Sequence, residues 1–283
     1  MMEQRVQALL SDYDGTLVPT ANVKNPKANS IPRELEEILR KVSSEMPVCV
    51  ISTKDFEFLR QRTIFAKVIS CMMGIETLVL KNHGSSRIIE KRLLHPDFEA
   101  LQMNSEALAA IAEEITLQEE FSHVLVERKY TSDGILAGLT IDWRHLGDWS
   151  YYSAGIGHFI GRMVANLRKP PVPVDIYIQK YSTHPFIDIY GIECNKGLTF
   201  DTVISELADI SVDSRSVLYL GDSENDNPAF RKAGISIGIR SDVRLNPKLD
   251  CSYFLNYEEL SSFLMKLREN DYVFTDRSIA SGT

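Results

Sequence analysis

Residues 6–17 read Val-Gln-Ala-Leu-Leu-Ser-Asp-Tyr-Asp-Gly-Thr-Leu, an apolar run that ends in the two aspartates Asp12 and Asp14. The apolar part predicts a strand, and residues two apart in a strand share a face, so both carboxylates can converge on one cation. Gly15 permits a sharp turn with exposed N–H groups, and Thr16 adds a hydroxyl donor. A cation such as Mg²⁺, a nucleophilic carboxylate and a nest of donors suit a phosphoryl group. The stretch predicts phosphoryl transfer; the simpler alternative is an Asp-Gly turn.

The composition is that of an ordinary globular protein. The chain has 283 residues, 44% of them hydrophobic and 25% charged, with a formal net charge of −8. Basic residues occur only in short pairs, and no apolar segment has the length of a membrane span. The N-terminus lacks the basic and apolar regions of a signal peptide. We therefore expect neither a nucleic acid nor a membrane as partner, and the oligomeric state stays open.

The cysteines are widely spaced and form no Cys-x-x-Cys pair; they are Cys49, Cys71, Cys194 and Cys251. A zinc site or a disulfide framework is therefore not expected. Most of them stand inside apolar runs, which predicts small buried side chains in a reducing compartment. We expect a cytoplasmic location.

The order of apolar patterns predicts an α/β core interrupted by an α+β insertion. Strand and helix alternate in the first and last thirds, and the continuous apolar run 47–52 is typical of a parallel strand buried on both faces. The middle third instead predicts strands over 121–130, 135–144, 175–181 and 185–192 and helices over 98–118 and 151–167. We expect a Rossmann-like parallel-sheet core over 1–86 and 190–270, an inserted domain over 87–189, and a flexible polar tail over 271–283.

A second acidic cluster, Gly-Asp-Ser-Glu-Asn-Asp, occupies residues 221–226 directly after a predicted strand. Asp222 can complete the cation shell begun by the first two aspartates. Asp226 lies one helical turn further on and can ligate the cation or orient a ligand water. Asn225 can hydrogen-bond a carboxylate or the phosphate. The alternative is a polar cluster that only caps a helix.

Two further positions suit phosphate binding. Ser52 and Thr53 end the strand over 47–52, where their hydroxyls can donate to phosphate oxygens at a helix N-terminus. Lys196 opens a predicted helix and can balance crowded carboxylates and phosphate. The alternatives are a helix cap and a solvated surface lysine. Because parallel strands present their carboxyl ends at one sheet edge, we expect all of these groups to meet there.

Taken in order, these residues resemble the four motifs of the haloacid dehalogenase-like phosphohydrolases: Asp12-Tyr13-Asp14-Gly15-Thr16, then Ser52, then Lys196, then Gly221-Asp222-x-x-x-Asp226. The insertion resembles the type-2 cap of that superfamily. The resemblance implies that Asp12 is the nucleophile that forms an aspartyl-phosphate and that Asp14 is the general acid and later the base. It further implies a Mg²⁺ site and a phosphate site, with metal residues Asp12, Asp14, Asp222 and Asp226 and phosphate residues Ser52, Thr53, Lys196 and Asn225.

Charged side chains on the predicted cap sheet suit the hydroxyls of a sugar. Glu127 and Lys129 share one strand face, as do Asp142 and Arg144. The alternative is an ordinary solvated sheet face with cross-strand ion pairs.

This part of the chain resembles the trehalose-6-phosphate phosphatases. Their cap has Glu-x-Lys on one strand and His-Tyr-Arg on the next, which stand here as Glu127-Arg128-Lys129 and Asp142-Trp143-Arg144. Asn82-His83-Gly84 resembles their His-Gly junction, and Asp188 their Glu before the third motif. The chain departs from them where Ser-Gly-Arg has become Ser52-Thr53-Lys54. The cluster over 221–226 is more similar to sucrose-phosphate and mannosyl-phosphoglycerate phosphatases.

The resemblances imply a Mg²⁺-dependent phosphatase for a small phosphosugar, with trehalose 6-phosphate as the first candidate and trehalose biosynthesis as the setting. Three alternatives stand beside it. One is a phosphatase for another substrate, of the sucrose-phosphate or mannosyl-3-phosphoglycerate type. The second is a phosphomannomutase-like phosphotransferase, which returns the phosphate to a sugar. The third is a phosphosugar-binding module, although such a module has no need of a nucleophile.

Overall fold

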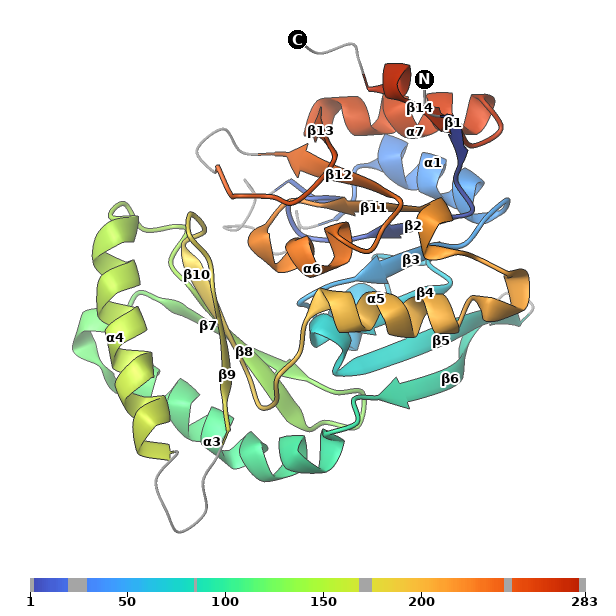
Figure 1. The fold of residues 1–283 in the computed structure, drawn as a ribbon. Coiled ribbons are helices and arrows are strands. Elements are labelled where there is room, and N and C mark those ends of the chain that lie inside the picture. The colour runs from blue at the N-terminus through green and yellow to red at the C-terminus, as the bar shows by residue number, and fades with distance from the viewer. Residues whose placement is uncertain (1–2, 20–29, 84–85, 168–174, 242–245, 280–283) are drawn as a thin grey trace.

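The computed structural model describes residues 3–19, 30–83, 86–167, 175–241 and 246–279. Figure 1 shows two parts, a larger α/β core that contains both chain ends and a smaller α+β cap. The predicted fold class, a parallel-sheet core with an inserted α+β cap, is confirmed.

The core is built on one eight-stranded sheet. Its strands, in spatial order, are β13 (Tyr253–Asn256), β12 (Ile235–Arg240), β11 (Val217–Gly221), β2 (Ala8–Ser11), β3 (Val48–Ile51), β4 (Val68–Cys71), β5 (Glu76–His83) and β6 (Ser86–Leu94). Neighbours from β13 to β4 are parallel, whereas β5 and β6 continue the sheet as an antiparallel hairpin. The carboxyl ends of β2, β3 and β11 therefore lie at one edge, side by side.

The central strands are buried on both faces, which explains their continuous apolar runs. In β2, Leu9 packs into one hydrophobic cluster, whereas Ala8 and Leu10 pack into another. The first cluster contains the buried sides of α1 (Arg33–Ser43) and α7 (Leu260–Glu269). The second contains those of α5 (Lys196–Ser205) and α6 (Asn227–Phe230). Helices on both faces force alternate residues of one strand into two separate cores. The short α2 (Phe56–Leu59) follows β3.

The cap has an antiparallel sheet covered by helices on one face only. Its strands are β7 (Leu125–Tyr130), β8 (Leu136–Asp142), β10 (Phe186–Tyr190) and β9 (Tyr177–Lys180), in that order. The helices α3 (Phe98–Leu117) and α4 (Trp149–Leu167) pack against its apolar face through a hydrophobic cluster of the cap's own. Alternate residues, such as Thr140 and Asp188 beside Ile141 and Ile187, project from the opposite face.

The predicted start of the cap at residue 87 is wrong. Residues 86–94 form β6, which pairs with β5 in the core sheet, so the chain crosses into the cap only between Leu94 and Phe98. The hairpin carries apolar residues that extend the core sheet, and an antiparallel strand can follow its neighbour through a tight turn without a crossover helix. Residues 84–85, which include Gly84 of the expected junction, lie outside the described part of the chain.

The predicted flexible tail is also wrong for residues 271–279. There β14 (Val273–Thr275) pairs with β1 (Glu3–Arg5). Phe274 is buried and contacts the rings of Tyr253 and Phe263. Phe274, together with Tyr272 and Ile279 packed against the same hydrophobic cluster, anchors this polar segment to the core, which composition alone does not reveal.

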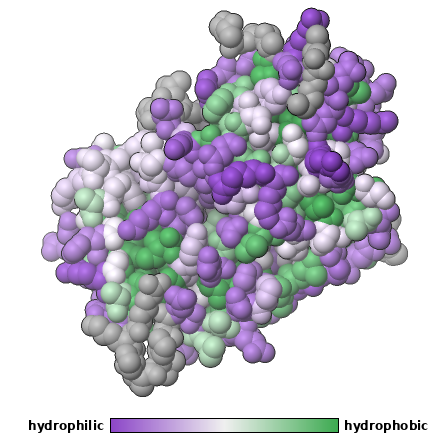
Figure 2. Space-filling view, in the orientation of Figure 1, coloured by the Kyte–Doolittle hydropathy of each residue, from purple (hydrophilic) through white to green (hydrophobic). Residues whose placement is uncertain are grey.

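Among the described residues, no helix is long and apolar enough to cross a membrane. On the face shown in Figure 2, hydrophobic patches are interrupted by hydrophilic residues.

Candidate active site

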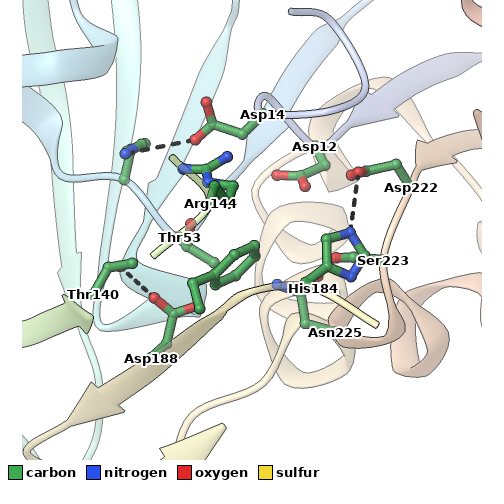
Figure 3. A pocket seen from close by; sticks show the side chains of 12 residues that line it. Asp12, Asp14, Thr53, Thr140, Arg144, His184, Asp188, Asp222, Ser223 and Asn225 are labelled. Atoms are coloured by element: carbon green, nitrogen blue, oxygen red, sulfur yellow. Dashed lines mark hydrogen bonds and ion pairs between the residues drawn. The ribbon is translucent and has the colours of Figure 1, made fainter. Parts of the chain in front are cut away.

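A pocket lies where the carboxyl edge of the core sheet meets the polar face of the cap sheet (Figure 3). It is lined by Asp12, Asp14, Thr53, Lys54, Thr140, Arg144, His184, Phe186, Asp188, Asp222, Ser223 and Asn225. The space at its centre is about 30 Å³, room for no more than a few water molecules.

Asp12 follows β2 and is 5% exposed. Its Oδ2 lies 2.9 Å from Nζ of Lys196, which opens α5 and is fully buried. Asp12, Asp222 and Asp226 each offer a carboxylate oxygen, and these oxygens all lie within 4.8 Å of one another. Three converging carboxylates beside one ammonium group form a donor set that suits a hard divalent cation such as Mg²⁺.

Asp226 is already fully hydrogen-bonded. Its Oδ1 accepts from Lys196 Nζ and from the hydroxyl of Tyr219, both at 2.7 Å. Its Oδ2 accepts from the backbone N–H groups of Asp222 and Ser223, both at 3.1 Å. These bonds favour a role in holding Lys196 and the 222–223 backbone in place over direct coordination of a cation.

The buried carboxylates carry more negative charge than the protein balances. Burial raises the pKa of Asp12 well above its usual range, and the carboxylates of Asp226 and Asp222 add to this, while Lys196 opposes it. Burial also raises the pKa of Asp222. For Lys196, burial disfavours the charged form, but the carboxylates of Asp12 and Asp226 outweigh it and raise its pKa. A cation among these groups would relieve the imbalance, which supports the fit of Mg²⁺.

Magnesium is expected to stabilise the fold. Because the carboxylates are held together only in the folded state, we expect Mg²⁺ to bind the folded state in preference to the unfolded one. At 100 times the dissociation constant the gain is about 2.7 kcal/mol, measured as a rise in the unfolding temperature. Asp222→Asn is expected to reduce that rise, and an equal rise in both proteins would contradict the assignment of the site.

Gly15 is required by two features of the loop after β2. Its φ of +79° lies in the left-handed region, and a Cβ there would lie 1.9 Å from Oδ2 of Asp222. Only glycine lets the backbone approach the carboxylate so closely. The hydroxyl of Thr16 donates to Oδ1 of the same carboxylate at 3.3 Å.

Gly15→Ala is expected to displace Asp222 and to weaken both Mg²⁺ binding and activity by about 10-fold or more. Gly134→Ala is the matched control, since Gly134 also has positive φ (+86°) but nothing lies within 4 Å of its Cβ position. The control should lose only about 1 kcal/mol of unfolding free energy, the cost of holding a residue with a Cβ at positive φ. Equal effects of the two substitutions on metal affinity would show that the approach to Asp222 is unimportant.

Asp14 faces the cap. Nζ of Lys54 lies 3.7 Å from Oδ2 of Asp14 and donates to both oxygens of Glu127, at 2.7 and 2.9 Å. Burial disfavours charge on Lys54, but Asp14 and Glu127 outweigh it and raise its pKa. Burial likewise works against ionised Glu127, and Lys54 and then Lys129 overcome it, so its pKa is lowered. Lys54 therefore links the core carboxylate to the cap.

Of the four predicted phosphate residues, two line the pocket and two are buried outside its lining. Thr53 and Asn225 line the pocket. Ser52 is fully buried beneath it, and its Oγ accepts a hydrogen bond from the backbone N–H of Lys54 at 3.2 Å. Lys196 also lies behind the pocket wall, against Asp12.

The charged cap residues are paired with one another. Nζ of Lys129 lies 3.0 Å from Oδ1 of Asp188, and both side chains are 1% exposed. Asp188 also accepts from the hydroxyls of Thr140 and Tyr181. Burial opposes its ionised form, but Lys129 and these hydroxyls outweigh it and lower its pKa.

Arg144 makes a forked contact with Asp142, through Nε at 2.9 Å and Nη2 at 2.7 Å. Arg144 reaches the pocket, whereas Asp142 lies behind it. Of the predicted cap residues, Arg144 and Asp188 line the pocket, Glu127 reaches it through Lys54, and Lys129 and Asp142 support these from behind.

No protein-family model matches the chain. Curated relatives in two strains of Mycobacterium tuberculosis (CDC 1551/Oshkosh and H37Rv), both described as an uncharacterized glycosyl hydrolase, are 26% identical over 246 residues. That stretch is 85% of this chain but only 16% of theirs, so the chain spans a small part of the curated relatives it matches.

Solved structures align over nearly the whole chain. A trehalose-6-phosphate phosphatase related protein has a TM-score of 0.64 at 15% identity, covering 93% of this chain and 97% of that one. The C-terminal domain of the C. albicans trehalose-6-phosphate phosphatase has 0.67 at 19%, covering 94% and 93%. A haloacid dehalogenase-like hydrolase from Bacteroides thetaiotaomicron has 0.57 at 14%, covering 93% and 100%. This chain has the haloacid dehalogenase-like fold.

Within that fold, the pocket also contains residues that the motifs do not include. They are Lys54, Thr140, His184, Phe186 and Ser223. Lys54 directly follows Ser52-Thr53, so its position after the strand was a usable signal. His184 comes from the connection between β9 and β10, and Phe186 is the first residue of β10. Only the folding of the cap sheet onto the haloacid dehalogenase-like core brings them to the pocket.

Proposed function

We propose that this protein is a Mg²⁺-dependent phosphatase that hydrolyses a phosphosugar through an aspartyl-phosphate on Asp12. The observation that supports this most strongly is the buried contact of Asp12 with Lys196 beside the carboxylates of Asp222 and Asp226. A nucleophile, a charge-balancing ammonium group and a cation site meet at one sheet edge, as phosphoryl transfer requires.

The residues divide the chemistry into two steps. An oxygen of Asp12 attacks phosphorus, and Asp14 gives its proton to the departing alcohol oxygen, so the P–O bond to the alcohol breaks as the aspartyl P–O bond forms. Asp14 then takes a proton from a water that attacks phosphorus, which releases phosphate and restores Asp12. Thr53, which lines the pocket, holds a phosphoryl oxygen, and Lys196 balances the charge on Asp12 from behind the pocket wall. When bound by Asp12, Asp14 and Asp222, Mg²⁺ neutralises charge between acid and ester.

The charge balance of the cap favours a sugar as the alcohol part of the ester. Its cations Lys129 and Arg144 are each paired with a carboxylate, Asp188 and Asp142 respectively, and Lys54 is paired with Glu127. Such pairs present hydroxyl-binding donors and acceptors without an excess positive charge for a second anionic group. We therefore favour a neutral sugar over a glycosyl-phosphoglycerate, with trehalose 6-phosphate as first candidate because of the likeness to proteins with that name.

The test is release of inorganic phosphate with Mg²⁺ from trehalose 6-phosphate, sucrose 6-phosphate, glucose 6-phosphate and mannosyl-3-phosphoglycerate. We expect release from a neutral-sugar phosphate and its loss in EDTA. Release from another ester would keep the mechanism and change the substrate. Isomerised sugar phosphate that depends on a bisphosphate activator would indicate a mutase instead. Binding of phosphosugars without turnover would indicate a binding module.

A further inference from the structure

His184 lies in the connection between β9 and β10 and is 4% exposed. Neither of its ring nitrogens makes a hydrogen bond among the described residues. The contact drawn from it in Figure 3 joins Nε2 to Oδ2 of Asp222 at 3.9 Å, which is too long for a hydrogen bond. Nδ1 makes no hydrogen bond within the described part of the chain. Leaving a buried polar group without a hydrogen bond costs about 1–3 kcal/mol. We therefore expect a molecule that enters the pocket to supply the hydrogen-bond partner of His184.

The imidazole belongs to an aromatic wall on the cap side of the pocket. Its ring centre lies 5.6 Å from that of Tyr181 and 5.4 Å from that of Phe186, and those two lie 4.6 Å apart. Tyr181 is itself fixed by hydrogen bonds to Asp188 and Asn225. These ring contacts pack the imidazole into the wall of the pocket.

The aromatic wall belongs to the cap, and its His184 faces Asp222 of the core across the pocket at 3.9 Å. The groups that suit the phosphoryl group, Asp12, Thr53 and Lys196, all come from the core. His184 and Phe186 come from the cap, as do Thr140 and Asp188, which line the same pocket. A neutral imidazole has one donor and one acceptor nitrogen, and a sugar hydroxyl can meet either. A phosphoryl oxygen that carries no proton can only accept, so it can pair with the N–H of the imidazole but not with the other nitrogen.

We propose that His184 hydrogen-bonds a hydroxyl of the sugar and, with the ring of Phe186 beside it, is a specificity-determining residue for the phosphosugar. The inference rests on the proposed function and adds a residue to it. A site built to bond a hydroxyl discriminates against esters that lack one, because its own polar atoms are then left unpaired.

The test compares two esters. His184→Phe keeps a ring in the aromatic wall and removes both nitrogens. For the best phosphosugar we expect kcat/KM to fall about 10-fold, mostly through KM. For p-nitrophenyl phosphate, which has no hydroxyl, we expect a change of less than about 2-fold. His184→Gln, with a donor and an acceptor, is expected to recover part of the loss. His158→Ala, on the exposed side of α4, is the matched control and should change neither value.

Equal losses of kcat/KM on both esters would overturn the inference, because they would assign His184 to the phosphate site or to the stability of the fold. No loss on either ester would also overturn it. Unfolding temperatures show whether each variant is folded, and His184→Leu, which also lacks both nitrogens, replaces the Phe variant if the latter is not. If the unmodified protein hydrolyses neither ester, the proposed function fails separately. The inference is then tested by phosphosugar binding to Asp12→Asn with and without His184→Phe. Binding that is about 10-fold weaker in the protein with both substitutions than in Asp12→Asn supports the inference. Equal binding by the two proteins, or no binding by either of them, overturns it.

Discussion

Asp12→Asn is expected to lower phosphate release by at least about 10³-fold while the protein stays folded. Asparagine has the shape of aspartate but cannot donate an electron pair to phosphorus from a carboxylate. Lys196 keeps its partner Asp226 at 2.7 Å, so no buried ammonium group is left alone. Burial and the neighbouring carboxylates of Asp226 and Asp222 raise the pKa of Asp12. Replacing its carboxylate by a neutral amide therefore relieves the repulsion among these acids. The unfolding temperature without metal should therefore not fall.

The measurement is phosphate release by both proteins, together with phosphosugar binding by calorimetry. Retained binding with lost turnover separates a nucleophile from a residue that only shapes the site. Asp209→Asn, at an exposed position of the core, is the matched control and should keep full activity. Asp12→Asn with a tenth or more of the original rate would show that Asp12 does not attack phosphorus.

Lys129→Met is expected to cost about 3–5 kcal/mol of unfolding free energy. The substitution leaves the carboxylate of Asp188 buried, 1% exposed and without its cation at 3.0 Å. The hydroxyls of Thr140 and Tyr181 remain as donors but cannot neutralise the charge. Methionine fills the space of the lysine stem, so the cost comes from the unpaired charge rather than from a cavity.

Chemical denaturation at several pH values tests this. Since the pKa of Asp188 is lowered in the folded protein, the pair stabilises above the ordinary carboxyl pKa of about 4 and is lost as pH falls through the folded-state value. The penalty of Lys129→Met should shrink over the same range. Adding Asp188→Asn to Lys129→Met should restore much of the stability. Arg215→Met, in an exposed pair with Asp213, is the control and should have no measurable effect. A similar loss in the control would contradict this account.

The parallel core could be predicted because its strands are buried on both faces. Runs such as Val48–Ile51 must be apolar at every position, and that pattern is local. The edge hairpin of β5 and β6 could not be assigned in the same way, since edge strands tolerate polar residues such as Lys81 and Glu90. Its membership in the core depends on pairing with β4, which no local pattern specifies.

For the site, the sequence by itself determined that Asp12, Asp14 and Asp222 lie close together, because they follow the parallel strands β2 and β11 and such strands end at one edge of the sheet. Only the tertiary structure decided which cap side chains reach the pocket. The pairing of β8 with β10 places Thr140 opposite Asp188, and the fold of the cap onto the core brings His184 to Asp222. Those contacts join residues far apart along the chain through strand register and domain packing, which depend on the whole fold rather than on neighbouring residues.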